Sequence, residues 1–411
     1  MSYSAFQPIT LPCGQTIKNR MAKAAMEENM SVAGQLPGNE LFRLYQRWAN
    51  GGSGLLITGN VMVSHRALTG PGGIVLEKNT DLAPFKRWAA HASENSTQVW
   101  MQINHPGRQV FAAMGGDVLS PSDIALDLGK HSRMFGQPRA MTVAEIQALI
   151  QQFADTAVQA ERAGFHGVQI HAAHGYLISQ FLSPLTNKRD DDYGGSIENR
   201  MRLLIEIIRA VRAQVSAGFA VAVKMNSADF QRGGFDGDDA RAVTLALNNE
   251  AVDLLELSGG SYESPAMQGR TADGRTLERE AYFLSFAKDI AQQAQMPVMT
   301  TGGVRRLPIA EQVLAEGFDM VGIGTALAMN PQLPNAWQRD ASVTAHDPVV
   351  QWQDKAIASL ATMAVIKRQL QRMGKGKNPK INASPLFSLI RDRLRMKKLV
   401  KRYRAYLAHQ G

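Results

Sequence analysis

Short apolar segments recur along the chain, each followed by glycine or polar residues and then by a longer stretch with apolar positions on one face. Eight of these segments are nearly continuous in apolar residues, which is typical of parallel strands that are covered on both faces. The pattern therefore predicts eight strands, at Met21–Met26, Leu55–Val61, Gln98–Ile103, Gly167–His171, Ala220–Met225, Asp253–Leu257, Pro297–Thr301 and Met320–Gly324.

Stretches with helical spacing separate most of these strands. The clearest one opens with Thr142 and Glu145 in the spacing of a capping box and is followed by Gly164, a residue that often ends a helix. The predicted helices are Glu40–Ala49, Leu82–Asn95, Thr142–Ala163, Ile197–Val215, Asp239–Asn249, Ala281–Gln293 and Arg306–Glu316.

The alternation of strands and helices predicts an α/β fold of the (β/α)8 TIM barrel type, which takes about 250 residues before insertions. The additional length follows strand 3, at His105–Met141, and strand 4, at Ala172–Gly195. The alternative is an open doubly wound sheet. A glycine-rich turn after strand 1 would favour that sheet, but Ala24–Glu27 contains no G-x-G-x-x-G motif.

Charge is distributed unevenly along the 411 residues, which carry 45 Lys and Arg against 36 Asp and Glu, a net charge of +9. Residues 346–411 hold 15 basic and three acidic side chains, a net charge of +12, whereas residues 1–345 hold 30 basic and 33 acidic ones, a net charge of −3. We therefore predict a barrel domain at 1–345 and a basic helical C-terminal extension at 346–411. Within the extension, helices are expected at Val349–Met373 and Ser384–His409.

The composition narrows the class of protein further. The single cysteine, Cys13, excludes an intrachain disulfide framework, a four-cysteine zinc site and a cysteine-ligated iron–sulfur cluster within the chain. No apolar run approaches the ~18 residues of a membrane span, and Met1–Gln15 lacks the pattern of a secretory signal. These features favour a cytoplasmic enzyme.

The basic extension has several interpretations. Most charge runs are solvated faces, so we expect its helices to pack on the barrel or on a second subunit of a homo-oligomer. Docking to an acidic protein surface or an anionic membrane is the alternative. Nucleic acid is the least favoured partner because no recognised binding fold accompanies the charge.

Candidate chemistry gathers at the carboxyl ends of the predicted strands, which form one mouth in a TIM barrel. Glycines follow strand 7, at Gly302 and Gly303, and strand 8, at Gly322 and Gly324. Glycines here can simply turn the chain, but they also let backbone N–H groups approach an anion. We predict a phosphate site at these two loops.

Four further residues near strand ends point to catalysis. His171 and His174 lack an obvious third ligand for a metal, and two neutral imidazoles that stabilise a developing oxyanion fit their spacing better, although a structural role for one of them stays open. Tyr176 is protonated at neutral pH and is either a general acid or a core aromatic residue. Lys224 lies in an apolar strand and needs an anionic partner, which is either a cofactor or a barrel carboxylate.

Several segments of the chain resemble the old yellow enzyme family of flavin-dependent ene-reductases. The resemblance rests on Ile17–Met26, Gln102–Gln109, His171–Arg200 and the TTGGV and GIGTAL segments after strands 7 and 8, and it covers roughly residues 3–340. It implies a barrel that holds FMN across its mouth and takes hydride from NADH or NADPH.

The resemblance also implies a role for each matching residue. Around the flavin, Ala24, Ala25 and Met26 back the ring, Asn60 and Gln102 contact its pyrimidine edge, Lys224 lies near N1 and O2, and Gly302, Gly303, Gly324 and Thr325 hold the phosphate. His171 and His174 match the pair that binds the substrate's electron-withdrawing group, and Tyr176 matches the tyrosine that protonates the substrate. The implied mechanism is ping-pong: the nicotinamide reduces FMN and leaves, and an activated alkene such as an enone or enoate then takes hydride from flavin N5 at its β-carbon.

Three features depart from the family pattern. Glu27 stands where relatives usually carry Thr or Cys, and it is a candidate for substrate contact. Thr325 stands where many relatives carry a phosphate-binding Arg, which leaves Arg305 as a candidate to balance the phosphate charge. The basic extension has none of the cysteine ligands of the iron–sulfur relatives, and we expect that its deletion leaves flavin chemistry intact unless one of its arginines completes the site.

Other functions fit parts of this pattern. A flavin dehydrogenase or demethylase would run the same barrel in the oxidative direction. A cofactor-free lyase or isomerase would explain the glycine loops but not the combination of Gln102, Lys224 and the two histidines. A flavin- or partner-binding protein that acts through its basic extension has no need of Tyr176.

Overall fold

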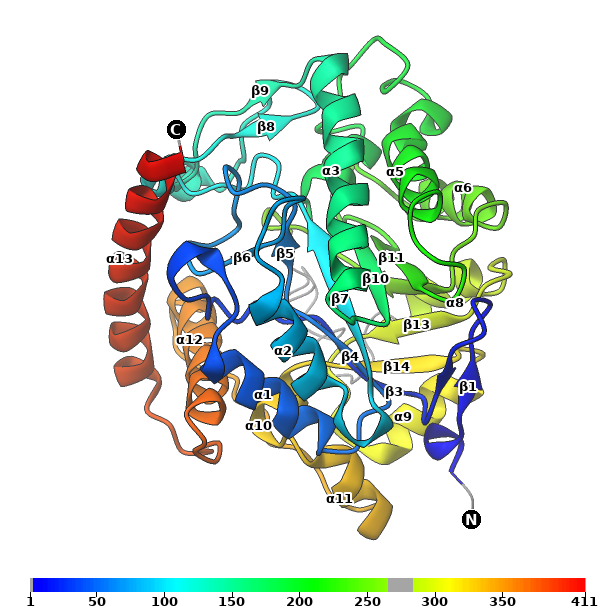
Figure 1. Ribbon diagram of the computed structural model, residues 1–411, viewed down its shortest axis with the longest axis vertical. Coiled ribbons are helices and arrows are strands. Elements are labelled where there is room, and N and C mark those ends of the chain that lie inside the picture. The colour runs from blue at the N-terminus through cyan, green and yellow to red at the C-terminus, as the bar shows by residue number, and fades with distance from the viewer. Residues whose placement is uncertain (1–2, 265–283, 411) are drawn as a thin grey trace.

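The computed structural model describes residues 3–264 and 284–410, and a closed barrel of parallel strands lies at its centre (Figure 1). Each barrel strand pairs with the next one along the chain, and β14 pairs with β3 to close the ring. The strands are β3 (Met21–Lys23), β4 (Leu55–Ile57), β7 (Gln98–Asn104), β10 (Gly167–Ala172), β11 (Ala220–Asn226), β12 (Leu254–Ser258), β13 (Val298–Thr301) and β14 (Met320–Ile323). The predicted TIM barrel is confirmed.

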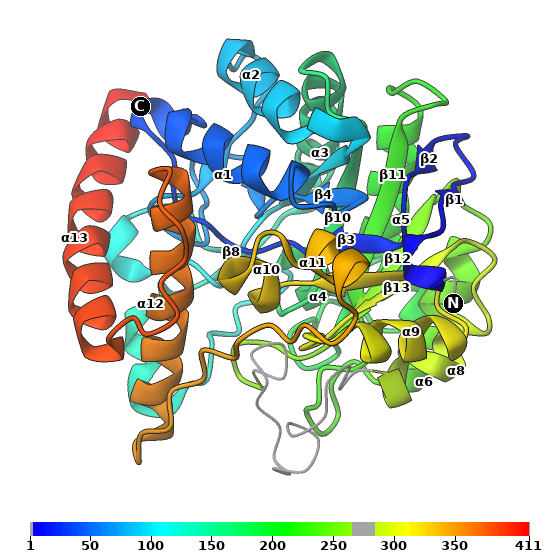
Figure 2. The ribbon, with the colours of Figure 1, turned by 90° about the horizontal axis from the view of Figure 1, so that it is seen from below.

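Helices surround the barrel, as Figure 2 shows from a second direction. They are α1 (Asn39–Ala49), α2 (Ala83–Ala92), α3 (Val143–Arg162), α5 (Ile197–Arg212), α6 (Gly237–Leu247), α8 (Leu284–Ala291) and α9 (Leu307–Ala315). Residues 281–283 of one predicted helix lie outside the described residues. The capping box of α3 is present, because Glu145 N donates to Thr142 Oγ1 at 3.2 Å and Thr142 N donates to Glu145 Oε2 at 2.9 Å.

The first two barrel strands are shorter than the apolar pattern predicts. β3 ends at Lys23 rather than Met26, and the segment predicted as Leu55–Val61 divides into β4 and β5 (Val61–Met62). The division arises because Gly59 N donates to the Tyr45 hydroxyl at 3.1 Å and to Glu28 Oε1 at 3.2 Å instead of to a neighbouring strand. Residues 24–32 and 58–60 therefore form loops at the carboxyl end of the barrel.

Apolar side chains fill the barrel interior at the opposite end, including Leu55, Trp100, Ala222 and Met299. The hairpin of β1 (Ile9–Thr10) and β2 (Thr16–Ile17) covers this end. Gln15, in its turn, donates from Nε2 to the carbonyls of His166 and Gly218 at 2.6 Å each. The hairpin therefore closes the amino end of the barrel, and the polar side chains that could take part in chemistry lie at the mouth.

The two predicted insertions lie at the mouth. After β7 the chain forms β8 (Leu119–Ser120) and β9 (Arg139–Ala140), and β6 (Ile74–Val75) pairs with β5 nearby. After β10 it forms the short helix α4 (Leu177–Leu182). The helices α10 (Thr325–Met329) and α11 (Leu333–Arg339) follow β14.

The extension folds into α12 (Lys355–Gly374) and α13 (Pro385–Gln410), close to the helices predicted there. α12 packs on α1, and α13 runs along one edge of the molecule (Figure 1). α13 also contacts loops of the barrel mouth: Arg395 Nη2 donates to the Asn29 carbonyl at 2.7 Å, and Arg402 Nη2 donates to the Ser31 carbonyl at 2.8 Å. These contacts tie the extension to residues 24–32, which argues against the expectation that it can be deleted without affecting the mouth.

In the described part of the chain, none of the helices combines the length and apolar character needed to cross a membrane.

Candidate active site

A buried chain of polar side chains crosses the barrel near its mouth. Gln102 Nε2 donates to Gln169 Oε1 at 2.7 Å, and Gln169 Nε2 donates to Glu256 Oε2 at 2.7 Å. Glu256 Oε1 lies 2.8 Å from Lys224 Nζ and accepts a hydrogen bond from Thr301 Oγ1 at 2.6 Å. Lys224 therefore has a barrel carboxylate as its partner, one of the two possibilities that the sequence left open.

Strand register explains this arrangement. Gln169 lies opposite Gln102 in the pairing of β10 with β7, and Glu256 lies opposite Lys224 in the pairing of β12 with β11. Gln169 and Glu256 were not recognised from the sequence. Polar residues at matching positions of adjacent apolar strands were the signal that could have identified them.

His171 and His174 lie together where β10 ends, with ring centroids 5.1 Å apart and planes at 82°. His171 is buried and His174 is half-buried, and their pKa values lie well below the usual value, first because burial penalises the charged form and second because Lys224 is nearby. Both imidazoles are therefore neutral at physiological pH.

His174 has a left-handed backbone conformation, with φ of 62°, which is uncommon for a residue other than glycine. Two contacts hold it there: its backbone N donates to Asn226 Oδ1 at 3.2 Å, and its Nε2 lies 2.9 Å from Ser258 Oγ. The Asn226 amide is itself fixed, because Nδ2 donates to Asp229 Oδ1 at 2.8 Å and to the Gly260 carbonyl at 3.0 Å. The strand ends of β11 and β12 thus set the position of this histidine.

Tyr176 precedes α4, and its ring packs edge-on against His171 with centroids 4.9 Å apart. Its hydroxyl lies 3.1 Å from the hydroxyl of Tyr262, a residue in the loop after β12 that was not recognised from the sequence. Burial, followed by the charges of Tyr262 and Glu27, raises the pKa of Tyr176 well above its usual value. The phenol therefore keeps its proton at neutral pH.

Glu27 lies close enough to this pair of tyrosines to raise the pKa of each of them. Its Oε1 accepts a hydrogen bond from Thr69 Oγ1 at 2.5 Å. The carboxylate is thus placed among the aromatic residues of the mouth.

A second buried network lies behind the loops of the mouth and was also not recognised from the sequence. Lys23 Nζ donates to the Ile57 carbonyl at 2.8 Å, contacts the Tyr45 hydroxyl at 3.2 Å and lies 3.6 Å from Glu28 Oε1. Burial lowers the pKa of Lys23 to about 8, and Glu28 opposes that shift. Because Glu28 and Gly59 share this network, it fixes the loops that carry Met26, Glu27 and Asn60.

Of the glycines predicted to form a phosphate site, Gly302, Gly303 and Gly324 follow β13 and β14, whereas Gly322 lies within β14. Gly303 has a φ of 68°, and Gly324 is the residue before α10, which Thr325 begins. Gly322 packs so tightly that a Cβ there would lie 2.0 Å from Thr301 Oγ1. At Gly324, by contrast, a Cβ would find the Met26 side chain, 4.0 Å away, as its nearest neighbour. A side chain at position 324 would therefore meet Met26 at ordinary van der Waals distance, so the loops after β3 and β14 approach each other at the mouth without crowding.

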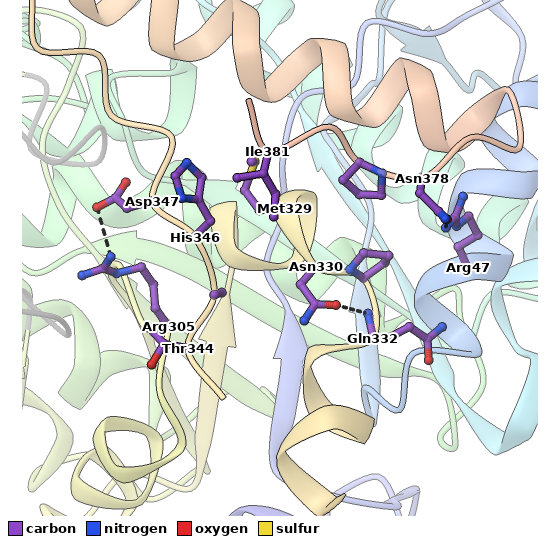
Figure 3. Close-up of a pocket in the computed structure, with 13 residues that line it drawn as sticks. Arg47, Arg305, Met329, Asn330, Gln332, Thr344, His346, Asp347, Asn378 and Ile381 are labelled. Carbon is purple, nitrogen blue, oxygen red and sulfur yellow. Dashed lines mark hydrogen bonds and ion pairs between the residues drawn. The ribbon is translucent and has the colours of Figure 1, made fainter. Parts of the chain in front are cut away.

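Arg305, the sequence candidate for balancing a phosphate, lies on the flank of the mouth. Its Nη1 is 3.5 Å from Asp347 Oδ2, and both residues line a groove of about 740 Å³ between the barrel and the segments flanking α12 (Figure 3). Arg47 lines the same groove and donates to Asn378 Oδ1 at 2.6 Å.

These residues fit a flavin mononucleotide. Lys224 supplies a buried cation, and Gly324 leaves room beside Met26. Asn60 Oδ1 and both amide atoms of Asn104 are buried at strand ends without a hydrogen-bond partner in the described structure, as polar atoms that bind a ligand would be. Among the described residues, no group of three or more His, Cys, Asp or Glu side chains is arranged to hold a metal ion.

Comparison with known proteins supports the same cofactor. Residues 4–342 match the NADH:flavin oxidoreductase / NADH oxidase family. The chain is 39% identical to the NADH-dependent flavin oxidoreductase iliE of Hypocrea jecorina over 84% of this chain and 92% of that protein. It is 32% identical to the NADPH dehydrogenase of Bacillus subtilis over 80% of this chain and 93% of that protein. Among solved structures, the old yellow enzyme homologue from Zymomonas mobilis is 25% identical, with a TM-score of 0.71 over 83% of this chain and 94% of that one.

Proposed function

This chain belongs to the NADH:flavin oxidoreductase / NADH oxidase family, of the old yellow enzyme type, and on that premise we propose that it reduces the C=C bond of an activated alkene by a ping-pong mechanism. The family's enzymes use FMN, with NADH or NADPH as the hydride donor. The observation that carries the proposal is the neutral pair of His171 and His174 beside a protonated Tyr176.

Bound FMN supplies the hydride chemistry, and the protein supplies binding, orientation and electrostatics. We assign the flavin ring to Ala24, Ala25 and Met26 on one side, with Asn60 and Gln102 at its polar edge. Lys224 would place its positive charge near the ring, and Gly302, Gly303, Gly324 and Thr325 would receive the phosphate. The orphaned Asn60 Oδ1 and the space at Gly324 support this assignment.

The two histidines would bind the electron-withdrawing group of the substrate. A neutral imidazole donates a hydrogen bond from one ring nitrogen, and two such donors aimed at one oxygen stabilise the negative charge that develops there. Because Lys224 and burial keep both rings neutral, this donor pattern does not change across physiological pH.

Tyr176 would protonate the substrate's α-carbon. Its raised pKa keeps the proton available until charge develops on the substrate, which is what a general acid requires. Glu27, near Tyr176 and Tyr262, is proposed to contact the substrate.

The spectrum of the purified protein tests this function. We expect a bound flavin that bleaches when NADH or NADPH is added without oxygen and regains its colour when cyclohexenone follows. A colourless protein that releases no FMN on denaturation would contradict the proposal. Flavin that a donor bleaches but that no enone, maleimide or nitroalkene reoxidises would favour the dehydrogenase alternative.

The outer face of α13 supports a second proposal, that the extension binds an anionic lipid surface. Its first turns expose Leu386, Phe387, Ile390 and Leu394, each more than half exposed. Basic residues surround and follow this apolar face, at Arg391, Arg393, Lys397, Lys398, Lys401 and Arg404, with Asp392 as the one acidic residue of the helix. Exposed apolar side chains flanked by basic residues are typical of helices that lie on anionic membranes.

Sedimentation with vesicles tests this second proposal. We expect the protein to sediment with phosphatidylglycerol vesicles at low salt and not with phosphatidylcholine vesicles. The variant Leu386→Ser/Ile390→Ser/Leu394→Ser should lose this binding while keeping its flavin. Equal recovery with both vesicles, or none with either, would contradict the proposal.

A further inference from the structure

Tyr262 forms a pair with Tyr176 that the reaction described so far does not use. The two hydroxyl oxygens are 3.1 Å apart, and the ring centroids are 5.9 Å apart at an angle of 71°. We propose that Tyr262 is the residue that returns a proton to Tyr176 after each turnover and stabilises the Tyr176 phenolate in between. This inference rests on the function proposed above.

The loop that carries Tyr262 is held in place by the same groups that hold the catalytic histidine. Gly260 N donates to the Ala228 carbonyl at 3.1 Å, and Ser261 N donates to the Ser264 carbonyl at 2.8 Å. Asn226, which binds His174 N, donates to the Gly260 carbonyl. Asn226 therefore links the loop that presents the Tyr262 hydroxyl to the backbone of His174.

The rest of the Tyr262 environment explains why Tyr176 needs a partner. The Tyr262 ring packs against Phe135 with centroids 6.1 Å apart. The charged groups nearby are Glu27 and the ion pair of Arg108 with Glu263, whose charged atoms are 2.6 Å apart. Arg108 is thus already paired with a carboxylate, and Glu27 disfavours a second negative charge. A phenolate on Tyr176 is costly in such a place, and hydrogen bonds from neighbouring groups offset part of that cost. The Asn60 side chain supplies one such bond, and the Tyr262 hydroxyl is placed to supply another.

The proton transfers balance without any change in oxidation state. As the substrate's α-carbon forms its C–H bond, the O–H bond of Tyr176 breaks and leaves a phenolate. The O–H bond of Tyr262 then breaks as its proton passes across the 3.1 Å contact to the Tyr176 oxygen. Tyr262 is less buried than Tyr176 and recovers its proton from water, so that each turnover consumes one proton from solvent.

A nitroalkene separates this proton step from hydride transfer. Hydride addition to a nitroalkene gives a nitronate anion, which is stable enough to be observed in the near ultraviolet before it is protonated at carbon. We would mix the anaerobically reduced holoenzyme with 1-nitrocyclohexene in a stopped-flow instrument and follow flavin reoxidation and nitronate decay separately. The variant Tyr262→Phe keeps the ring and removes only the hydroxyl.

We expect Tyr262→Phe to reoxidise its flavin within about twofold of the wild-type rate and to slow nitronate decay by about tenfold or more, up to the roughly 10²–10⁴-fold that a general acid itself contributes. Tyr176→Phe should slow nitronate decay at least as much. The control is Tyr193→Phe, because the Tyr193 hydroxyl bonds with Gln147 of α3 and Glu206 of α5 rather than with Tyr176 or Tyr262, and this variant should leave both rates unchanged.

Two outcomes would overturn the inference. One is an unchanged nitronate decay rate and an unchanged solvent isotope effect on it in Tyr262→Phe. The other is an equal slowing of flavin reoxidation and nitronate decay, which would indicate a purely structural role. If neither a nitroalkene nor an enone reoxidises the flavin of the wild-type enzyme, the proposed function itself fails. That result is distinct from both of the outcomes above.

Discussion

At the residue scale, the most consequential contact is the ion pair of Lys224 with Glu256, whose side chains are 4% and 0% exposed. We expect Lys224→Met to lower the free energy of unfolding of the flavin-free protein by about 3–5 kcal/mol, because it leaves a buried carboxylate without its cation. Lys224→Met/Glu256→Gln should recover part of that loss, since no buried charge remains. Urea unfolding of the three proteins measures the difference, and a double variant less stable than the single one would contradict this account.

The histidine pair leads to a prediction about ligand binding. In the proposed site, a phenol above the oxidised flavin would place its oxygen on the two histidines, so His174→Ala should weaken the binding of p-hydroxybenzaldehyde by about tenfold through loss of one charge-assisted hydrogen bond. Titration of the long-wavelength absorbance of the complex measures the affinity. The variant His166→Gln, at a half-buried site beside β7 and outside the mouth, is the matched control. Unchanged affinity in His174→Ala would remove the role assigned to that residue.

Buried histidines also make stability depend on pH. Burial lowers the pKa of His105 to about 4, whereas an unfolded histidine titrates near 6.5. Between these values the unfolded state binds more protons, so the free energy of unfolding falls as the pH decreases from about 6.5 to about 4. Asp229 has the opposite effect on stability. Burial raises its pKa to about 6, so the folded state binds a proton at a higher pH than the unfolded state does, and this proton uptake stabilises the folded state as the pH decreases.

A single substitution isolates the contribution of His105. Its Nδ1 accepts a hydrogen bond from Gly107 N at 3.1 Å, and His105→Asn offers an oxygen in a similar place without a titrating group. We expect the loss of stability between pH 7 and pH 4.5 to be smaller in the variant by about 1–3 kcal/mol. Urea midpoints across this pH range measure it, and parallel pH profiles for the two proteins would contradict the assignment.

The residues of the mouth were only partly predictable from the sequence. His171, His174, Tyr176 and Lys224 stand out because polar groups at the ends of apolar strands need a reason to be there. Tyr262 and Glu28 do not stand out, because each lies in a loop and acquires its role from a neighbour distant in the chain.

At the scale of elements, the strand pattern was sufficient to predict the barrel but not the residues at which its strands end. β3 and β4 stop early because Lys23, Tyr45, Glu28 and Gly59 form a network that removes backbone groups from the sheet. Such a network depends on side chains from three elements and leaves no periodic signal in any of them.

The contacts of α13 lead to a prediction for this helix. Tyr403 and Leu399 are buried, and the Tyr403 hydroxyl donates to the His65 carbonyl at 2.7 Å. We expect a chain that stops after Asn382 to unfold several degrees lower than the full chain, and to bind FMN more weakly because residues 24–32 lose the hydrogen bonds from Arg395 and Arg402.

Calorimetry and fluorescence titration with FMN measure these two effects. Lys397→Ala/Lys398→Ala is the control, because both side chains are exposed and the pair should match the wild type in both measurements. A shortened chain with unaltered melting temperature and FMN affinity would show that the extension is independent of the mouth.

At the scale of the whole molecule, the sequence showed that the positive charge is concentrated in the extension. It did not show where the extension packs on the barrel. The +12 of residues 346–411 marks the extension as a separate stretch of composition. Its inner face nevertheless packs on α1 and on the loops after β3, β5 and β7, through a few residues dispersed among the charged ones. Composition averages over a helix, whereas packing depends on which of its sides carries the apolar residues.

The hydrogen bonds from Arg395 and Arg402 to the Asn29 and Ser31 carbonyls have a consequence for synthesis of the protein. A ribosome makes residues 29–31 long before residues 395 and 402, so the nascent chain carries an unsupported mouth until α13 has been synthesised. Contacts this distant in sequence form late in folding, because a long loop must close before they can be made. The mouth therefore reaches its final arrangement only after α13 has been made, and a chain that terminates before α13 lacks the hydrogen bonds that hold residues 29 and 31.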